Sequence, residues 1–268
     1  MSDTHQTNAI NEAAARLSAS KASREPCAPV RDLIGADDVV AAYAVQDRLT
    51  DAVLATGGRL VGRKIGLTAT AVQRQLGVDQ PDYGMLFADM DVPCGDEITA
   101  NELLQPKCEA EIAFILGKTL DDERLTVADI LSAVEWVLPA IEVVDSRIAD
   151  WDIRIADTVA DNASAGRFIL GHTARRIDQI DLIGCGMVME KGGDVVSTGA
   201  GIACLGSPLN ATLWLAKRMA AVGRPLRSGD VVLSGALGPM VAALPGDQFE
   251  ARISGLGSVS VGFARASS

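Results

Sequence analysis

The sequence predicts an α+β fold whose second half consists mainly of β-strands. From 37 to 58 the segment DDVVAAYAVQDRLTDAVLATGG places apolar residues near helical spacing, opens with acids and closes at Gly57-Gly58, which predicts an amphipathic helix. Later segments alternate apolar and polar residues or are rich in β-branched residues, as strands are. With 268 residues, 48% of them hydrophobic, the chain can bury a sizeable core in one large domain or two tightly joined ones.

Residues 59–67, RLVGRKIGL, alternate between two faces, and this pattern predicts a strand. One face carries Lys64 between Gly62 and Gly66. Because neither glycine has a side chain, we expect room for a ligand beside Lys64. A surface lysine is the alternative that the strand pattern alone also allows.

Residues 108–146 are expected to run strand, helix, strand. CEAEIAFIL opens the segment with the pattern of a strand. Thr126 with Asp129 resembles a capping box that begins a helix through Val137, and Pro139 is expected to stop that helix. AIEVVDS, which is rich in β-branched residues, is then the next strand.

Most of the remaining chain is expected to form strands. GMVMEKGGDVVSTG has the pattern of a hairpin that turns between Lys191 and Asp194. PLNATLWLAKRMAAVG predicts a helix that begins at Pro208 and ends at Gly223. The strand patterns DVVLSG, QFEARI and SVSVGFA follow, separated by Gly or Pro turns.

The first 30 residues differ from the rest in composition. They are rich in Ala, Ser and charge and end in the pair Pro26 and Pro29, which predicts a loosely attached helix followed by an extended link. The sequence contains no internal repeat, no low-complexity tract and no composition break sharp enough to separate independent domains.

The charge of the chain excludes several classes of partner. With 35 acidic and 24 basic residues the net charge is −11, so the surface should repel nucleic-acid phosphates and anionic membranes. The apolar stretches are interrupted by charge or Gly too often to span a bilayer, and the first residues contain no apolar signal-peptide core. A cytoplasmic location is therefore expected.

The cysteines and histidines limit the kind of metal site. The five cysteines are widely spaced and never form C-x-x-C, so we expect buried thiols and no zinc ribbon or disulfide framework. The two histidines, His5 and His172, leave no material for a His-rich zinc site and make a Ser-His-Asp triad improbable. Any metal must therefore be held by oxygen atoms, which favours Mg²⁺ or Mn²⁺.

Three glutamates carry the strongest chemical pattern. Glu109 and Glu111 lie two apart in an otherwise apolar strand, so both carboxylates are expected on one face with Cα atoms roughly 7 Å apart. A solvent-exposed face is the structural alternative for that pair. Glu142 changes this interpretation because it is embedded in VLPAIEVV, where an ionised carboxylate is costly unless it is paired or coordinated. One divalent ion shared by the three would remove both the repulsion and the burial cost.

Other polar segments are less specific. Asp82 lies in the turn-rich GVDQPDYG. Aspartate is common in turns, so this position is explained without a catalytic role. VADNAS, with Asp161, Asn162 and Ser164, fits a pocket or a plain loop. SGALGPM could offer backbone N–H groups and the Ser234 hydroxyl to a carboxylate, although a Gly turn explains it equally well. GAGIACLG follows a hairpin, lacks a suitable downstream acid and fits no Walker pattern, so we reject a nucleotide cofactor.

Six of these segments occur in the order found in 2-hydroxypenta-2,4-dienoate hydratases, also called 2-oxopent-4-enoate hydratases. They are GRKIGLT, GVDQPDYGMLFADM, EAEIAF, VLPAIEVVDSRIADW, VADNAS and SGALGPM. The chain resembles this group from about Arg59 to Phe263. The group is related to 4-oxalocrotonate decarboxylases and, more distantly, to fumarylacetoacetate hydrolases.

The resemblance implies a mixed β-sheet roll of the fumarylacetoacetate-hydrolase C-terminal type with peripheral helices. Residues 59–268 would form this metal-binding catalytic domain, after an N-terminal helical segment at 1–58. The resemblance also implies a homo-oligomer, often a pentamer or decamer, and a role in the meta-cleavage pathway of aromatic-compound catabolism. Its partners would be a small dienoate substrate and other enzymes of the same pathway.

Residue by residue, the resemblance makes Glu109, Glu111 and Glu142 the ligands of Mg²⁺ or Mn²⁺ and gives Lys64 and Asp82 roles in proton transfer. The decarboxylases share the lysine and the metal carboxylates but have an apolar residue in place of Asp82, so that position favours hydration. The expected substrate-binding residues are Asp161, Asn162, Ser164, Ser234, Gly235 and Leu237.

The implied reaction begins with the substrate's C1 carboxylate and C2 oxygen bound at a Lewis-acidic metal. Ketonisation with proton delivery to C5 gives an α,β-unsaturated ketone, and water then adds at C4 to give a 4-hydroxy-2-oxo acid. Either Asp82 or Lys64 activates the water, and the residues alone do not decide which is the base.

Three other functions are compatible with parts of this pattern. A metal-dependent decarboxylase of a 2-oxo-dienedioate would use the same chelate and release CO₂. A C–C bond hydrolase would need an added base such as a histidine near the metal, and His172 is poorly placed for that role. A non-enzymatic scaffold subunit would not need Lys64, Asp82 and three glutamates together.

Overall fold

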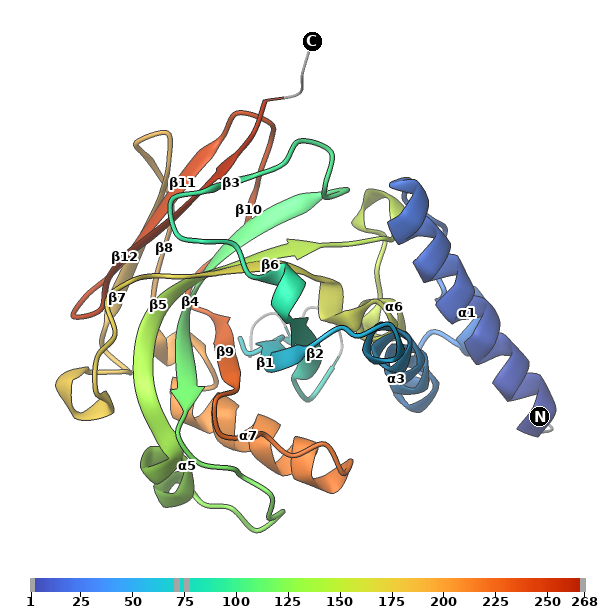
Figure 1. Ribbon diagram of the computed structural model, residues 1–268, viewed down its shortest axis with the longest axis horizontal. Helices are drawn as coiled ribbons and strands as arrows, with labels where there is room; N and C mark the ends of the chain where they lie inside the picture. The colour runs from blue at the N-terminus through green and yellow to red at the C-terminus, as the bar shows by residue number, and fades with distance from the viewer. Residues whose placement is uncertain (1–2, 70–72, 75–77, 266–268) are drawn as a thin grey trace.

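The computed structural model describes residues 3–69, 73–74 and 78–265, and these form two β-sheets with helices around them (Figure 1). Gly77, the first residue of the GVDQPDYG segment, lies outside the described residues. The helices are α1 (Asp3–Ser23), α2 (Arg31–Ile34), α3 (Val39–Ala55), α5 (Val127–Ala133), α6 (Ile155–Ala160) and α7 (Pro208–Ala221). The strands are β1 (Leu60–Gly66), β2 (Asp82–Phe87), β3 (Glu97–Ile98), β4 (Pro106–Leu116), β5 (Val134–Asp145), β6 (Ala165–Leu170), β7 (Gly186–Lys191), β8 (Asp194–Ala200), β9 (Val231–Ala236), β10 (Val241–Ala242), β11 (Gln248–Ile253) and β12 (Gly257–Phe263).

The larger sheet has the order β2-β1-β9-β4-β5-β6, with β10 paired to β4. β1 and β9 run parallel, whereas β4 is antiparallel to both β5 and β9, so the sheet is mixed. The long pair β4 and β5 curves through the middle of the molecule (Figure 1). The mixed sheet with peripheral helices confirms the predicted α+β roll.

The smaller sheet, β3-β12-β11-β7-β8, closes the roll on one side. Its strand β12 contacts β5 and β6 of the larger sheet, and the two sheets share one apolar core. Phe114, Ile141 and Ile169 line this core from the larger sheet, and Phe249 and Val261 line it from the smaller one, each at most 1% exposed. Burial between two twisted sheets therefore fixes which residues of β4 and β5 face inward.

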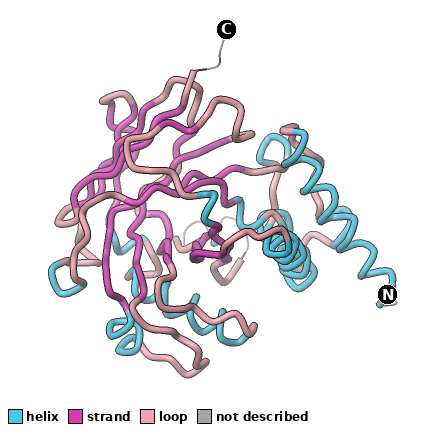
Figure 2. Tube along the Cα trace, viewed as in Figure 1, coloured by secondary structure: helices cyan, strands magenta, loops and turns pink. Residues whose placement is uncertain are grey.

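Helices α1, α2, α3 and α6 form a second core at the opposite side of the larger sheet (Figure 2). Ala13 and Leu17 of α1 are buried against this core, so the N-terminal helix is firmly packed and the expected loose attachment is wrong. Residues 24–30 do form a link, in which the backbone N of Cys27 donates to the carbonyl of Arg147 at 2.8 Å. The expected segment boundary at 58 falls between α3 and β1.

The helix predicted to run through Val137 begins as expected but ends earlier. The capping box at Thr126 and Asp129 is present, but α5 stops at Ala133 and β5 begins at Val134. Pro139 lies inside β5 although it has no N–H to donate. Its carbonyl accepts from Gly171 N, so its nitrogen points to the same side, toward the chain that follows β6, where no ladder donor is needed. The β-branched residues that follow made only the second half of β5 recognisable.

Most other predicted elements are confirmed. The hairpin turns between Lys191 and Asp194, α7 begins at Pro208, and the three late strand patterns are β9, β11 and β12. All five cysteines are free thiols; Cys108, Cys185 and Cys204 are buried, whereas Cys27 and Cys94 are partly exposed. Among the described residues, no helix combines the length and apolar character needed to cross a membrane.

A buried ion pair joins the end of α6 to the segment that follows β5. Nε of Arg147 donates to Asp161 Oδ1, and the backbone N of Arg147 donates to Oδ2 at 2.8 Å. Nη1 of Arg147 also donates to the carbonyl of Ala165 at 3.1 Å. Asp161 is 1% exposed, and burial raises its pKa to about 6 although Arg147 opposes that rise. Without the guanidinium, Asp161 would be a buried and uncompensated acid.

We therefore expect Arg147→Met to lower the free energy of unfolding by about 3–5 kcal/mol. Denaturant unfolding followed by circular dichroism measures this loss. Arg124→Met is the matched control, because it removes only an exposed pair with Asp122 and should leave the midpoint unchanged. Equal midpoints for the two variants would contradict the role given to Arg147.

Candidate metal centre and active site

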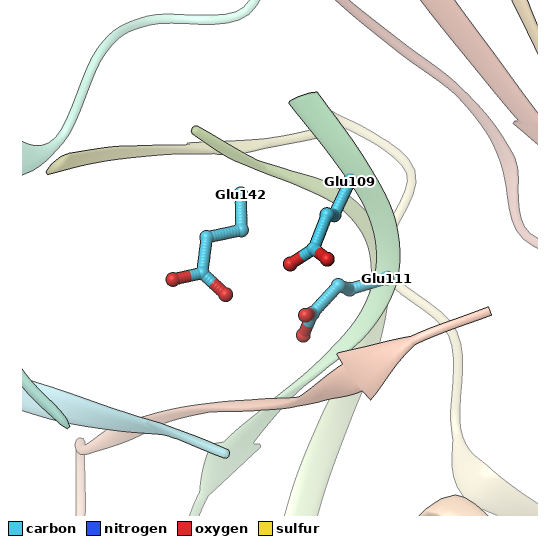
Figure 3. A group of neighbouring side chains, drawn as sticks. All are labelled: Glu109, Glu111 and Glu142. Atoms are coloured by element: carbon cyan, nitrogen blue, oxygen red, sulfur yellow. The ribbon is translucent and has the colours of Figure 1, made fainter. Parts of the chain in front are cut away.

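Three carboxylates meet at the centre of the larger sheet (Figure 3). Glu109 of β4 stands directly opposite Glu142 of β5, and Glu111 follows two residues later on the same face of β4. One oxygen from each of the three lies within 4.8 Å of the others. The predicted convergence of these side chains is thus present in the structure.

The burial of this cluster is nearly complete. Glu111 and Glu142 are 0% exposed, and Glu109 is partly exposed. Burial raises the pKa of all three carboxyls, that of Glu142 to about 7 and that of Glu111 well above its ordinary value. For Glu111 the charges of Glu142 and Glu109 raise the pKa further. Three acids placed so close together cannot all remain ionised without a compensating cation.

The unpaired oxygen atoms of the cluster fit a divalent cation. Glu142 Oε1 lies 3.3 Å from Lys64 Nζ, and neither oxygen of Glu142 nor Oε1 of Glu111 makes a hydrogen bond of normal geometry within the described chain. The other oxygen of Glu111 accepts from Gly235 N at 2.8 Å, which fixes the orientation of that carboxylate. Buried acceptors without donors are rare in proteins, and an oxygen-only set suits a hard ion such as Mg²⁺.

Lys64 supplies the positive charge of the site. It is 3% exposed, and its Nζ lies 3.3 Å from Glu142 Oε1, so the surface-lysine alternative is wrong. Burial alone would lower the pKa of Lys64, but Glu142 and Asp82 together raise it above its ordinary value. Lys64 is therefore a cation held beside the carboxylates.

Asp82 lies close to Lys64. It opens strand β2, pairs with Gly66 of β1, is 2% exposed and leaves its Oδ1 without a hydrogen-bond partner. Burial raises its pKa, which Lys64 partly offsets. A Cβ added at Gly66 would lie 2.1 Å from Asp82 Oδ1 and 3.3 Å from Lys64 Nζ. The space expected for a ligand at Gly66 is thus filled by the Asp82 carboxylate, and that at Gly62 by the backbone of Val231.

The expected substrate-binding residues of the VADNAS segment have partners elsewhere in the chain. Asp161 is held by Arg147, and the side chain of Asn162 donates to the Met85 carbonyl and accepts from its N–H at 2.9 and 2.7 Å. Ser164 Oγ lies 3.3 Å from Thr158 Oγ1. These contacts hold the left-handed turn η3 (Asn162–Ser164) over Gly84, where an added Cβ would lie 2.4 Å from the carbonyl of Asn162. The side chains thus build the turn.

The SGALGPM segment closes the cluster from β9. Gly235 has φ +107°, and a Cβ there would lie within 3 Å of the Thr68 side chain, so only glycine fits. Ser234 Oγ is buried and lacks a partner in the described chain. Leu237 is 1% exposed, and its N–H donates to Ala110 on β4 at 2.9 Å. The segment therefore brings an N–H donor to Glu111 and leaves one hydroxyl free.

Comparison with known proteins agrees with this geometry. The model of the fumarylacetoacetate (FAA) hydrolase C-terminal family matches residues 61–263. The chain belongs to this family.

Two relatives and one solved structure narrow the position within the family. The TodF product hydratase of Pseudomonas putida is 59% identical over 264 residues, which cover 98% of each chain. A 2-keto-4-pentenoate hydratase of Dechloromonas aromatica is 57% identical and covers 97% of this chain and 100% of its own. The structure of 4-oxalocrotonate decarboxylase from Pseudomonas putida G7, complexed with magnesium and adipate, superposes with a TM-score of 0.91 at 35% identity, covering 95% of this chain and 97% of that one. The similarity to all three extends over the N-terminal helices, beyond the range that motifs alone indicated.

Sequence reasoning missed two features of the site. The first is the partner of the Gly235 N–H: the sequence indicated a substrate carboxylate, whereas this N–H donates to Glu111, across a register shift between β4 and β9 that no local pattern encodes. The second is Gly66, whose role is to admit the Asp82 carboxylate. An isolated glycine inside a strand pattern was the only available signal for it.

We expect Gly66→Ala to lower turnover by roughly 100-fold, because the new methyl group must displace the carboxylate of Asp82, a group suited to proton transfer. Mn²⁺ binding, measured by electron paramagnetic resonance, should be retained because the three glutamates are untouched. Gly186→Ala is the matched strand control, since its Cβ would meet Ser254 Oγ at an ordinary 3.6 Å. Full turnover in Gly66→Ala would show that the position of Asp82 is unimportant.

Proposed function

We propose that this protein is a divalent-metal-dependent hydro-lyase that hydrates 2-hydroxypenta-2,4-dienoate, or a close C5-substituted analogue, to a 4-hydroxy-2-oxo acid. The observation that carries the proposal is a buried Asp82 beside Lys64 and next to three converging glutamates. Such a site offers both a cation-binding end and a proton-transfer end. The relatives named as hydratases, at 57% and 59% identity, support the same reaction.

Glu109, Glu111 and Glu142 would hold the ion, for which Mg²⁺ and Mn²⁺ are the best candidates because all the donors are carboxylate oxygens. When bound, the ion would act as a Lewis acid toward the carboxylate and C2 oxygen of the substrate. Gly235 N fixes one oxygen of Glu111 and so keeps the other free.

The residues of the chain divide the proton transfers between them. Conversion of the dienol to the unsaturated ketone removes a proton from the C2 hydroxyl and adds one at C5. Addition of water then places OH at C4 and H at C3. In this proposal Lys64, 3.3 Å from Glu142 Oε1, stabilises negative charge on the C2 oxygen, and Asp82, which approaches the same Gly66 as Lys64, exchanges a proton with the attacking water.

The rival reaction is decarboxylation of a 2-oxo-dienedioate, which would use the same metal site. Its support is the likeness to a decarboxylase structure at 35% identity. Incubation of the purified protein and Mn²⁺ with each substrate distinguishes the two reactions. We expect loss of the ultraviolet absorbance of the dienol without CO₂ release. Release of CO₂ from the dienedioate as the faster reaction would overturn the proposal.

We expect Glu142→Gln to abolish metal-dependent turnover while leaving the fold intact. The change removes one of three carboxylates and weakens Mn²⁺ binding, which electron paramagnetic resonance measures independently of activity. Glu135→Gln, on the exposed part of the same strand, is the matched control and should bind Mn²⁺ normally. Normal affinity in Glu142→Gln would remove this residue from the ligand set.

We expect Asp82→Asn to slow hydration by about 10²–10⁴-fold, the range usual for loss of a general acid or base. Mn²⁺ affinity should stay within about twofold of the wild type, because Asp82 is not one of the three converging carboxylates. Steady-state kinetics and a metal titration measure the two effects separately. Unchanged kcat would exclude Asp82 from the chemistry.

A further inference from the structure

The glycine-rich segment 199–206, which fits no nucleotide-binding pattern, lies against the end of β9. Its sequence is GAGIACLG, and it includes the short turn η5 (Gly201–Ala203). The backbone N of Ala200 donates to the carbonyl of Leu237 at 3.2 Å, and a Cβ added at Gly199 would lie 1.8 Å from that same carbonyl. The segment therefore approaches the chain after β9 more closely than any residue with a side chain allows.

The far end of this segment contacts the chain that follows β1. The backbone N of Leu205 donates to the carbonyl of Thr68 at 3.1 Å. Thr68 in turn lies against Gly235, because a Cβ added to that glycine would lie 2.4 Å from Thr68 Oγ1. The segment thus contacts both Leu237, which closely follows Gly235 in the chain, and Thr68, which packs on it.

Cys204 connects this segment to the residue that orients Glu111. Its side chain is 0% exposed, and its Sγ donates to the carbonyl of Gly235 at 2.9 Å and, over a longer 3.6 Å, to that of Ala236. Burial and the negative charge of Glu111 raise the pKa of the Cys204 thiol, so it keeps its proton and can donate. Since the N–H of Gly235 donates to Glu111 Oε2 at 2.8 Å, Gly235 is held from both of its backbone polar groups.

Gly235 needs such support because of its backbone conformation. It has φ +107° and lies at the register shift between β4 and β9, where the pairing of the two strands is interrupted. Glycine is also the residue with the greatest backbone freedom, so contacts must fix the direction of its N–H. The S–H of Cys204 holds the carbonyl of this residue and so restricts that freedom.

We propose that Cys204 is a positioning residue of the metal centre, whose thiol fixes the backbone of Gly235 and so keeps Glu111 in the orientation that binds the ion. The inference rests on the metal site of the proposed function and adds to it a residue that contacts neither the ion nor the substrate. Loss of a group that orients a metal ligand commonly costs about 10–100-fold in metal affinity. Because Cys204 acts through Gly235, its effect should lie at the low end of that range.

The test measures the Mn²⁺ affinity of full-length variants by electron paramagnetic resonance, which needs no turnover. Cys204→Ala removes the donor and should raise the Kd for Mn²⁺ by about tenfold. Cys204→Ser retains a donor and should keep the Kd within about twofold of the wild type. Cys204→Val removes the donor but fills more of the space than alanine does, so it should weaken binding as Cys204→Ala does if the hydrogen bond matters and the cavity does not.

Cys185→Ala is the matched control. Cys185 is also a buried thiol, 3% exposed, but its Sγ donates to the carbonyl of Leu182 at 3.7 Å and not to the backbone that holds Glu111. Both alanine variants should lose some stability in denaturant unfolding, because each leaves a small cavity. A merely structural role for Cys204 would end there, whereas the positioning role requires that Cys204→Ala alone of the two also loses Mn²⁺ affinity.

The outcomes separate this inference from the proposed function. Wild-type Mn²⁺ affinity in folded Cys204→Ala and Cys204→Val would overturn the positioning role and leave the proposed function in place. A loss of affinity in Cys204→Ser or Cys185→Ala equal to that in Cys204→Ala would also overturn it, because the thiol donor at 204 would then not be the cause. A wild-type protein that binds no Mn²⁺ would overturn this inference together with the metal site of the proposed function.

Discussion

The repulsion between three buried carboxylates is the constraint on which the rest of the site depends. Glu111 and Glu142 have no exposed surface, and within the part of the chain that the structure describes Lys64 is the one basic side chain paired with them. One lysine cannot balance three carboxylates. A structure that brings these groups together without a cation would cost several kcal/mol for each uncompensated charge. A divalent ion bound between the three carboxylates would remove this cost.

Strand register enforces this costly arrangement. Glu109 and Glu142 are directly opposite in the β4–β5 ladder, and Lys64 and Gly84 are opposite in the β1–β2 ladder, so each side chain points to a fixed face. The irregularity between β4 and β9 turns the N–H of Gly235 toward Glu111. The apolar core between the two sheets holds these registers, and the carboxylates cannot move apart without exposing it.

The glutamate cluster was predictable because its signal is local. A period of two in one strand and an apolar run around Glu142 are enough to infer one shared face and a buried charge. Asp82 was not predictable in the same way. Its turn-rich segment suggests a loop, and its burial comes from β1 and from the distant helices that surround it. Only the family resemblance identified it in advance.

The same limit explains the wrong start of β5 and the unforeseen partners of Asn162. Val134 to Leu138 precede the β-branched run of β5, and they become a strand because β4 pairs with them, which a short local pattern cannot show. Asn162 resembles a ligand-binding amide in sequence, yet both of its polar groups are used by the backbone of Met85. The sequence pattern indicates that a polar side chain will form hydrogen bonds. The tertiary fold decides which group is its partner.

Charge balance also distinguishes Asp82 from the glutamates. A divalent ion together with Lys64 carries three positive charges, which offset the three glutamates. Asp82 is the additional acid; it is buried, its Oδ1 accepts no hydrogen bond within the described chain, and burial raises its pKa. A carboxyl group in that position exchanges its proton more readily than a ligand of the ion can. In the proposed reaction, this exchange would take place with the water that adds at C4.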